Sequence, residues 1–400
     1  MANCLSIEKT SRRGFLRSAS ASAAVVAAST CSPIHTAATV EKPICVTGAN
    51  GYVGLHVVDQ LLRSDYSVRA ALRNLSEAKT KWLTQIAADA GSNNRLSFVE
   101  FDILDSSSLQ RAASGCDSII HLATPFQLKQ SSNPQAEIVD PAVTGACNAV
   151  LAASALKLRK VVACGSIFGA VGSGSEKGFD HIYDASDVNN YNTINGCTYG
   201  FSKREAQERS SELAARLGVD LCTLNVGQLC GPALSPDQRN PSWKPVILLA
   251  NSPKGAPTFS ACFPAFADVR DAAAALVSAL KLAPTYLPRR YIVASQTKSP
   301  TFAEIERILN ILDTDPNIFP SAVQSLMIAG VSLGDKSQEE LLYGITVPPG
   351  KTVLVDIAPM TRDLLAAPRS IKETISDFVA NQESYGYDIH GKSYLTFALD

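Results

Sequence analysis

The chain has 400 residues, of which 46% are hydrophobic and 18% are charged. This composition supplies apolar side chains for a sizeable core and excludes a disordered chain. Lysine and arginine (36) balance aspartate and glutamate (37), so no basic excess exists to neutralise a phosphate backbone, and nucleic acid is not an expected partner. The ten cysteines are scattered without a CxxC pair, which favours free thiols over disulfides or a metal site.

Residues 1–40 differ in composition from the rest of the chain. They contain four basic residues and one acid, followed by an uncharged run rich in serine and alanine. The segment 11–17 (SRRGFLR) is similar to a twin-arginine export signal, while the acid-poor composition also fits an organelle transit peptide or a flexible tail. We expect targeting by this peptide, with a cytoplasmic protein as the alternative. The uncharged run is too short for a membrane span, so no integral membrane segment is expected.

A glycine-rich turn follows the first predicted strand. The short apolar run 43–47 leads into Gly48, Gly51 and Gly54, and then into a helical stretch with one apolar face. Glycines at this spacing allow a tight turn, close approach of the backbone to a pyrophosphate, and packing of the helix on the sheet. The phosphates would lie on free N–H groups at the positive end of the helix. The pattern therefore predicts a dinucleotide site.

The next predicted strand, 67–72, ends at Arg73. An NAD-preferring site usually has an acid near this point to hold the ribose 2′-hydroxyl. A guanidinium instead suits the 2′-phosphate of NADP, because it offers a charged, bidentate donor. Arg73 therefore predicts NADP as the cofactor, whereas we interpret Lys79 and Lys81 as solvated surface cations.

Three further strands are predicted, at 96–101, 118–122 and 160–164. Asp102 and Ile103, at the end of the first of these, are expected to meet the adenine. His121 is interpreted as a packed strand residue, because no acid or nucleophile lies near it in the sequence. Strands and helices alternate with short linkers, which predicts an α/β fold with a doubly wound parallel sheet of the Rossmann type.

The pair Tyr199 and Lys203 is the main chemical signal. The two residues are four positions apart at the start of a helix expected over 202–217, so they share one helix face. An ammonium beside a phenol favours the phenolate, so Lys203 is expected to lower the pKa of Tyr199. Ser166 follows the fifth strand, where its hydroxyl would hold a substrate carbonyl. Tyr199 would then deliver the proton and the nicotinamide the hydride.

These motifs resemble the extended short-chain dehydrogenases/reductases, most of all the dihydroflavonol 4-reductase and cinnamoyl-CoA reductase group. The resemblance spans about residues 42–294, and more loosely reaches 381. It rests on TGANGYVG (47–54), VRAALRN (68–74), HLATP (121–125), CGSIFGAV (164–171), YGFSK (199–203) and the Gly231-Pro232 pair. It implies that Ser166, Tyr199 and Lys203 are the catalytic residues. No metal site is expected. The resemblance also implies cofactor contacts from Gly48, Gly51, Tyr52, Val53, Gly54, Arg73, Asp102, Ile103, Leu122, Ala123, Thr124, Tyr199 and Lys203.

The chain departs from the pattern of that family at several positions. The family usually has Thr-Ser-Ser where this chain has CGS at 164–166, although the reactive serine is kept. Val226 replaces a usual proline, and Val171 stands where flavonoid reductases tend to have a substrate-contacting asparagine. Residues 172–195 also diverge. The resemblance therefore implies the type of reaction, but it does not imply a flavonoid substrate.

We expect three parts along the chain: the N-terminal peptide (1–40), an NADP-binding Rossmann domain (41–232) and a mainly substrate-binding lobe (233–400) to which Rossmann elements return near 258–295. Prolines after residue 232 break the chain into loops and short elements. Asp268 is expected to cap the helix that follows it. The aromatic residues of the lobe either line an apolar pocket or pack in its core: Trp243, Phe259, Phe263 and Phe266.

The sequence thus predicts an NADP-dependent reductase, a monomer or homodimer. Its substrate would carry a ketone, aldehyde or thioester-derived carbonyl on a medium-sized apolar or aromatic molecule. NAD-dependent epimerases, dehydratases and hydroxysteroid-type dehydrogenases use the same residues and form the first alternative, against which Arg73 argues. A dinucleotide-binding regulator without activity is the second alternative, and the complete set of Ser166, Tyr199 and Lys203 argues against it.

Overall fold

The structure is a computed structural model. The structure describes residues 42–124, 131–173, 176–238, 240–250, 261–312, 345–387 and 389. The chain divides into two units, Met1–Val40 and Glu41–Asp400. The twin-arginine-like segment and Phe259 lie outside the described residues. The targeting peptide and the division of residues 41–400 into a Rossmann domain and a lobe remain predictions.

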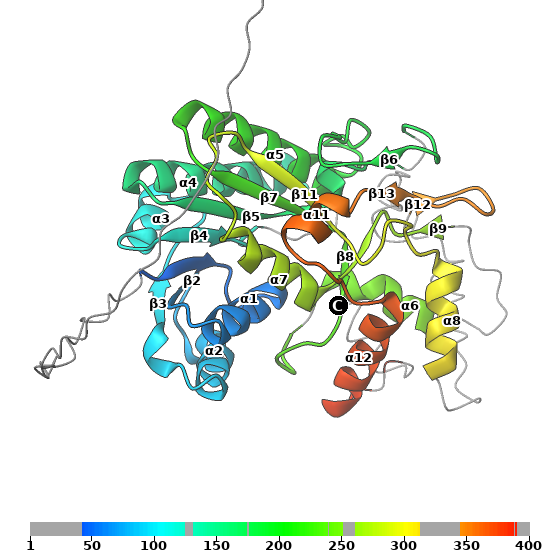
Figure 1. Cartoon of the computed structure of the whole chain (residues 1–400), viewed down its shortest axis with the longest axis horizontal. Coiled ribbons are helices and arrows are strands. Elements are labelled where there is room, and N and C mark those ends of the chain that lie inside the picture. The colour runs from blue at the N-terminus through cyan, green and yellow to red at the C-terminus, as the bar shows by residue number, and fades with distance from the viewer. Residues whose placement is uncertain are drawn as a thin grey trace, which may run out of the picture. The chain divides into compact units, whose positions relative to one another are not determined.

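A seven-stranded sheet forms the centre of the second unit (Figure 1). The strands lie in the order β11-β7-β5-β4-β1-β2-β3, and every neighbouring pair is parallel. Their bounds are β1 Ile44–Thr47, β2 Val68–Leu72, β3 Leu96–Glu100, β4 Ser118–His121, β5 Lys160–Ser166, β7 Leu221–Val226 and β11 Arg289–Val293. The strand order reverses between β1 and β4, which is where sheets of this type bind ligands. The predicted doubly wound Rossmann-type fold is therefore confirmed.

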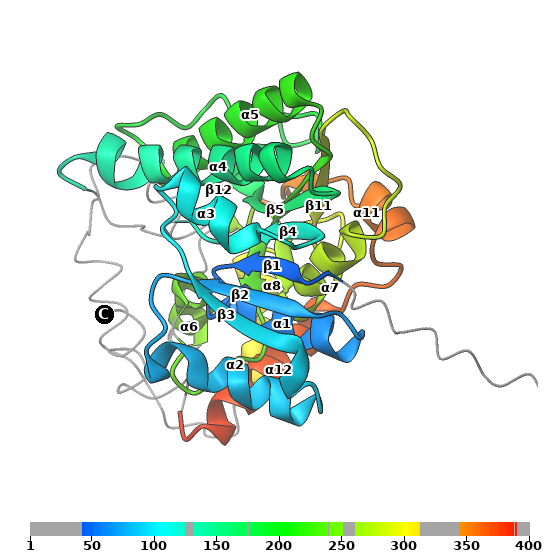
Figure 2. The ribbon, with the colours of Figure 1, turned by 90° about the vertical axis from the view of Figure 1, so that its left-hand side faces the viewer.

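Helices cover both faces of this sheet, as Figure 2 shows. One face carries α1 (Tyr52–Arg63), α2 (Glu77–Asp89) and α7 (Val269–Ala279), and the other carries α3 (Ser106–Ala113), α4 (Asp140–Leu156) and α5 (Thr198–Leu217). The strands of such a sheet have no solvated face, so their side chains need not alternate between apolar and polar. Every residue of β1, β4 and β7 is accordingly buried.

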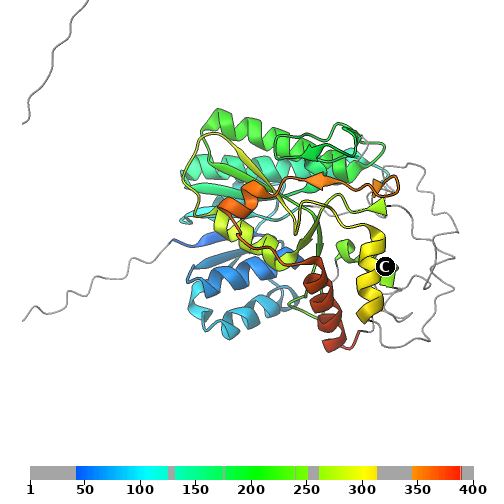
Figure 3. The same cartoon turned by 45° about the vertical axis from the view of Figure 1, so that its right-hand side comes forward.

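Smaller elements complete the unit beside the carboxyl ends of the central strands. Short two-stranded sheets pair β8 (Gln228–Cys230) with β10 (Phe266–Asp268), β9 (Ala261–Cys262) with β12 (Ile345–Thr346), and β6 (Ile182–Tyr183) with β13 (Leu354–Val355). The helical elements are η4 (Pro241–Trp243), α6 (Lys244–Ala250), α8 (Phe302–Leu312), α11 (Ala358–Asp363) and α12 (Ile371–Ser384). Figure 3 shows α8 in yellow beside α12 in red.

The aromatic residues of this part belong to its core. Trp243, Phe263 and Phe266 are all at most 2% exposed and pack with Phe378 from α12. Trp243 also meets Tyr52 edge-on, with ring centroids 5.0 Å apart. Of the two interpretations of these aromatic residues, core packing is therefore the one that the structure supports.

Two helix boundaries bear on the expected site. Helix α5 begins at Thr198, four residues before the predicted start, because the Cys197 sulfur accepts a hydrogen bond from the Gly200 N–H and caps the first turn. Asp268 caps α7 as expected, accepting a hydrogen bond from the Arg270 N–H at 2.8 Å. Tyr199 thus lies inside the first turn of a regular helix, which fixes its direction relative to Lys203.

One described segment, Gln135–Leu156, is long and apolar enough to cross a membrane by length and composition. It combines a π-helical turn, Gln135–Val139, with α4. Half of its most apolar stretch is buried inside the fold, and α4 packs between α3 and α5. A buried core helix meets the same criteria of length and composition.

Candidate active site

The turn between β1 and α1 is built for close approach of backbone atoms. Gly48 has a φ of +68°, a conformation that side chains rarely adopt, and a Cβ there would lie 3.0 Å from the Ala123 nitrogen at the end of β4. A Cβ on Gly54 would lie only 2.3 Å from the Gly48 carbonyl oxygen. These positions therefore require glycine, for the reasons that the glycine spacing predicted.

Helix α1 begins in a way that suits an anionic ligand. Its N-cap residue, Gly51, provides no side-chain hydrogen bond, and its first turn contains no acidic residue. The first N–H groups of a helix have no partner within the helix, and they carry the positive end of its dipole. The start of α1 thus offers N–H groups to a pyrophosphate, and this chain fits a dinucleotide at that point.

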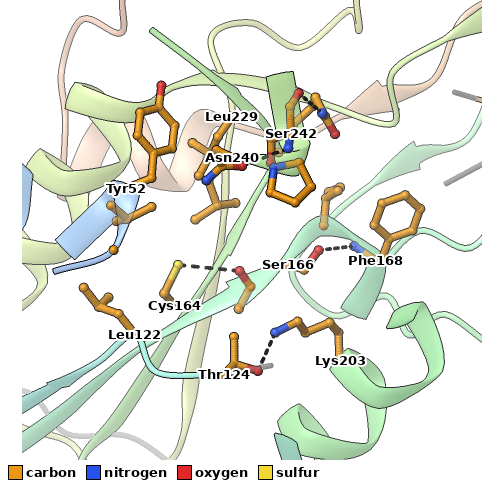
Figure 4. A pocket seen from close by; sticks show the side chains of 18 of the residues that line it. Tyr52, Leu122, Thr124, Cys164, Ser166, Phe168, Lys203, Leu229, Asn240 and Ser242 are labelled. Carbon is orange, nitrogen blue, oxygen red and sulfur yellow. Dashed lines mark hydrogen bonds between the residues drawn. The ribbon is translucent and has the colours of Figure 1, made fainter. Parts of the chain in front are cut away.

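A cavity of about 420 Å³ joins this turn to the predicted catalytic residues (Figure 4). From the glycine turn and the end of β4 it is lined by Gly48, Gly51, Tyr52, Val53, Gly54, Leu122 and Thr124. From β5 and α5 it is lined by Cys164, Gly165, Ser166, Tyr199 and Lys203. The structure therefore brings together groups that are far apart in the sequence, at the carboxyl edge of the sheet where ligands bind.

A second cavity, of about 780 Å³, shares Gly48 and Thr124 with the first. The remaining predicted cofactor residues line it: Arg73, Asp102, Ile103 and Ala123. Arg73 is exposed and has no hydrogen-bond partner in the described part of the chain, so its guanidinium is available to a ligand. The two cavities thus meet at Gly48 and Thr124, and together they contain all the residues predicted to contact the cofactor.

The lysines after Arg73 differ in their surroundings. Lys79 is exposed, as expected, but it also lines the second cavity beside Arg73. Lys81 instead forms an ion pair with Asp237, with Nζ 2.7 Å from Oδ2, so it is a surface residue with a partner of its own. Arg69, also close in sequence, donates to the carbonyl oxygens of Ala112 and Ser114 and has no part in the cavity.

Ser166, Tyr199 and Lys203 form one connected group. Ser166 is the last residue of β5, is 8% exposed, and hydrogen-bonds Tyr199 through its side chain. The Lys203 ammonium donates to Thr124 Oγ1 at 2.8 Å and lies 5.1 Å from the centroid of the Tyr199 ring. Thr124, predicted only as a cofactor contact, is therefore also what holds the lysine.

The expected lowering of the Tyr199 pKa by Lys203 is not found. Burial raises the pKa of Tyr199 well above its ordinary value, and the hydrogen bond from Ser166 offsets this only in part. Burial also lowers the pKa of Lys203 to about 8. The prediction failed because removal from water disfavours both charged forms, and because the ammonium lies over the ring face of Tyr199. Tyr199 is consequently protonated, as a proton donor must be.

Two other sequence interpretations concern residues near this group. His121 is buried, its Nδ1 lies 3.0 Å from Thr47 Oγ1, and burial lowers its pKa to about 4, which agrees with a packed, neutral strand residue. Val171 is fully buried in a core cluster and does not line either cavity. The loss of asparagine at position 171 therefore has no direct effect on the cavity wall.

The opposite wall of the first cavity was not predicted from the sequence. It is formed by β8, η4 and the start of α6, with Gln228, Leu229, Asn240, Ser242 and Pro245. Figure 4 shows Asn240 and Ser242 across the cavity from Ser166 and Lys203. Asn240 Oδ1 accepts a hydrogen bond from the Ser242 N–H at 2.8 Å. The many prolines of this segment indicated loops. The sequence did not indicate that these loops face the catalytic residues.

A doubly wound sheet with a glycine turn and an adjoining serine, tyrosine and lysine defines the class of dinucleotide-dependent oxidoreductases of the short-chain type. Comparison with known proteins agrees with this class. The chain belongs to the NAD dependent epimerase/dehydratase family, whose model matches residues 44–294. This match confirms the resemblance to extended short-chain dehydrogenases/reductases. Together with the relatives below, it identifies the chain as an NAD(P)-dependent reductase.

Relatives with assigned names include reductases. Cinnamoyl-CoA reductase 1 of Arabidopsis thaliana is 33% identical over 249 residues, which cover 61% of this chain and 68% of that protein. Dihydroflavonol 4-reductase of Hordeum vulgare is 30% identical over 203 residues, covering 48% of this chain and 54% of that protein.

Solved structures share the fold at lower sequence identity. Yeast methylglyoxal/isovaleraldehyde reductase Gre2, complexed with NADPH, superposes with a TM-score of 0.66 at 20% identity, covering 86% of this chain and 99% of that one. Vestitone reductase from alfalfa gives 0.64 at 18%, covering 87% and 100%. At these identities the likeness concerns the fold.

Proposed function

We propose that the chain is an NADPH-dependent carbonyl reductase. Its substrate would be a medium-sized apolar or aromatic ketone, aldehyde or acyl thioester. The observation that carries the proposal is the single cavity in which the glycine turn faces Ser166, Tyr199 and Lys203. The named reductases among the relatives, which include cinnamoyl-CoA and dihydroflavonol reductases, support carbonyl reduction.

The preference for NADPH rests on the second cavity. Arg73 stands at the end of β2, where NAD-preferring sheets place an acid, and Lys79 lines the same cavity. Two cations at this point favour the dianionic 2′-phosphate over a ribose hydroxyl. The NADPH bound by the structurally similar yeast reductase agrees with this preference.

When bound, the nicotinamide supplies a hydride to the carbonyl carbon. The Ser166 hydroxyl orients the carbonyl oxygen, and Tyr199 transfers its phenolic proton to that oxygen. A ketone or aldehyde thereby becomes an alcohol, whereas an acyl thioester becomes a hemithioacetal that releases its thiol to give an aldehyde. Lys203, held by Thr124, stabilises the phenolate that Tyr199 becomes in this step. In the reverse direction Tyr199 would take the proton of a CH–OH group, and the oxidised nicotinamide would be the hydride acceptor.

The lining of the cavity supports an uncharged substrate. Among the described residues that line it, Lys203 is the only charged one, and the opposite wall offers the neutral side chains of Gln228, Asn240 and Ser242. Ile167, Phe168, Val226 and Leu229 add apolar surface. Such a lining favours an apolar or aromatic molecule with few hydrogen-bonding groups.

A panel of carbonyl compounds tests the proposal directly. Purified protein is mixed with NADPH or NADH and with aliphatic aldehydes, aromatic aldehydes, ketones or acyl thioesters, and the loss of the reduced cofactor's absorbance is followed. We expect oxidation of NADPH with at least one aromatic or apolar carbonyl, and none with the Ser166→Ala variant. If no carbonyl is reduced, the proposal fails. An epimerase or dehydratase, which consumes no reduced cofactor overall, or a dinucleotide-binding regulator without activity then takes its place.

A further inference from the structure

A cluster of buried polar side chains lies behind the catalytic residues. Gln207 follows Lys203 by one turn of α5, and Thr223 and Asn225 lie on β7. These three residues are at most 5% exposed. The nitrogen and oxygen of both amides and the Thr223 hydroxyl have no hydrogen-bond partner in the part of the chain that the structure describes. Buried polar groups in folded proteins are nearly always hydrogen-bonded to protein or to ordered water. This cluster is therefore a candidate site for a bound polar molecule.

A small cavity adjoins the cluster. It measures about 40 Å³ and lies between α4, α5 and the sheet, with Lys203, Gln207 and Thr223 in its walls. An internal site needs only about 10–15 Å³ of such volume to hold a water molecule, together with two to four polar partners. Thr124, which holds the Lys203 ammonium, also lines the cavity. The cavity is therefore large enough and polar enough for water.

Two glycines allow the amides to approach the segment that carries Ser166. A Cβ on Gly165 would lie 2.5 Å from Asn225 Oδ1, and one on Gly169 would lie 3.1 Å from Gln207 Oε1. Gly165 is one of the positions where the sequence departs from its family pattern. Because glycine has no side chain, this position leaves room for the Asn225 amide. The departure from the family pattern at Gly165 therefore allows the polar cluster to form.

We propose that this cavity is a binding site for internal water held by Gln207 and Thr223, and that Gln207 acts through this water as a positioning residue for Lys203. The Lys203 ammonium has three N–H donors, of which one is directed to Thr124 Oγ1. Water in the cavity accepts a second and solvates a charge that the fold otherwise removes from bulk solvent. Gln207, whose amide both donates and accepts, fixes the orientation of that water.

The other groups around Lys203 do not supply this solvation. The titratable side chains that face it are Cys164 on β5, His121 on β4 and Tyr199 on its own helix, while α4 contributes alanines. Burial raises the pKa of Cys164 to about 11 and that of Tyr199 further, and it lowers the pKa of His121 to about 4. All three are therefore uncharged near neutral pH, and none can balance the ammonium.

Gln207→Leu and Thr223→Val test the proposal, with Ser210→Ala as the matched control. Ser210 lines the same cavity one turn further along α5, but its hydroxyl already donates to the Gln207 carbonyl oxygen at 3.3 Å. Thr223→Val keeps the shape of the side chain, so it carries the test if Gln207→Leu does not fold.

The first readout is a high-resolution crystal structure of the unaltered protein. We expect a water oxygen in this cavity within hydrogen-bond distance of both Gln207 and Thr223. A dry cavity, or a direct hydrogen bond between the two amides that fills it, would overturn the proposal.

The second readout is the titration of Lys203 itself, followed by NMR of protein labelled at the lysine ε-carbons and assigned with Lys203→Arg. Loss of the water should lower the titration midpoint in both test variants by about one pH unit, a tenfold change in the acid dissociation constant. Ser210→Ala should leave the midpoint in place. An unchanged midpoint in the test variants, or an equal shift in the control, contradicts the positioning role. Neither readout needs a carbonyl substrate, so the result is independent of the proposed activity.

Discussion

The side chain of Lys203 is buried where it contacts two other residues of the site. Its ammonium donates to Thr124 and lies against the Tyr199 ring, while 8% of its surface remains exposed. The same burial that fixes these contacts disfavours its charge and that of a Tyr199 phenolate. The resting site therefore holds a protonated tyrosine beside a lysine whose pKa burial lowers to about 8.

Tyr199→Phe should abolish turnover and leave NADPH binding nearly intact. The substitution removes only the hydroxyl that donates the proton, and loss of a positioned general acid costs a factor of about 10²–10⁴ in rate. Turnover is measured by the loss of NADPH absorbance, and the dissociation constant by quenching of NADPH fluorescence. Retained turnover would exclude Tyr199 as the proton donor.

Arg73→Ala should weaken NADPH far more than NADH. Its guanidinium lines the second cavity without a partner among the described residues, and a hydrogen bond to a charged group contributes about 1.5–3 kcal/mol, or a factor of about 10–150 in affinity. The KM values for both cofactors provide the measurement. Lys81→Ala serves as the control, because Lys81 is paired with Asp237. An equal effect of Arg73→Ala on NADPH and NADH would refute the role at the 2′-phosphate.

The rate of carbonyl reduction should fall as the pH rises through about 8. Burial lowers the pKa of Lys203 to about 8, so the ammonium is present below this pH and is lost above it, while Tyr199 stays protonated throughout. The pH profile of kcat/KM should show this alkaline limb. The limb should disappear from the residual activity of Lys203→Arg, because a guanidinium does not titrate in this range. Its persistence there would assign it to another group.

Among the elements, strands β5 and β7 and helix α5 set the geometry of the site. The sequence predicted β5 and the residues Ser166, Tyr199 and Lys203, because apolar runs and short spacings are local signals. The start of α5 was placed too late, since a cysteine sulfur is an unusual cap for a first turn. The wall formed by Gln228, Asn240 and Ser242 could not be predicted, because only tertiary packing brings it to the catalytic residues.

Helix α7 allows the energetics of one element to be tested. Asp268 is fully buried, caps the helix, accepts a hydrogen bond from Thr374 and pairs with Arg270. Removing one member of a buried ion pair costs about 3–5 kcal/mol, so Asp268→Ala should lower the free energy of unfolding by about that amount.

Urea denaturation provides the measurement for this variant. Asp59→Ala is the control, since its pair with the exposed Arg63 is a surface ion pair worth about 0–1 kcal/mol. If the two variants lost equal stability, the cap and the ion pair would not support α7 as described.

At the scale of the whole molecule, the chain divides into two units, Met1–Val40 and Glu41–Asp400. We propose that residues 1–40 direct the protein to its compartment, and the paired arginines at 12 and 13 make this testable. A fusion of residues 1–40 to a fluorescent protein, expressed in bacteria that have the twin-arginine system, should be exported. Arg12→Lys with Arg13→Lys should keep it inside. Retention of the unaltered fusion, with delivery to plastids in a plant cell, would favour the transit-peptide alternative.

The two walls of the first cavity come from different stretches of the chain. Ser166, Tyr199 and Lys203 stand on β5 and α5, whereas Gln228, Asn240 and Ser242 stand on β8 and η4, outside the seven-stranded sheet. A substitution in the second stretch can alter which molecules are admitted without disturbing the proton donor or the nucleotide turn. The preference of such an enzyme can therefore diverge, or be redesigned, within one short segment, while its chemistry is inherited intact.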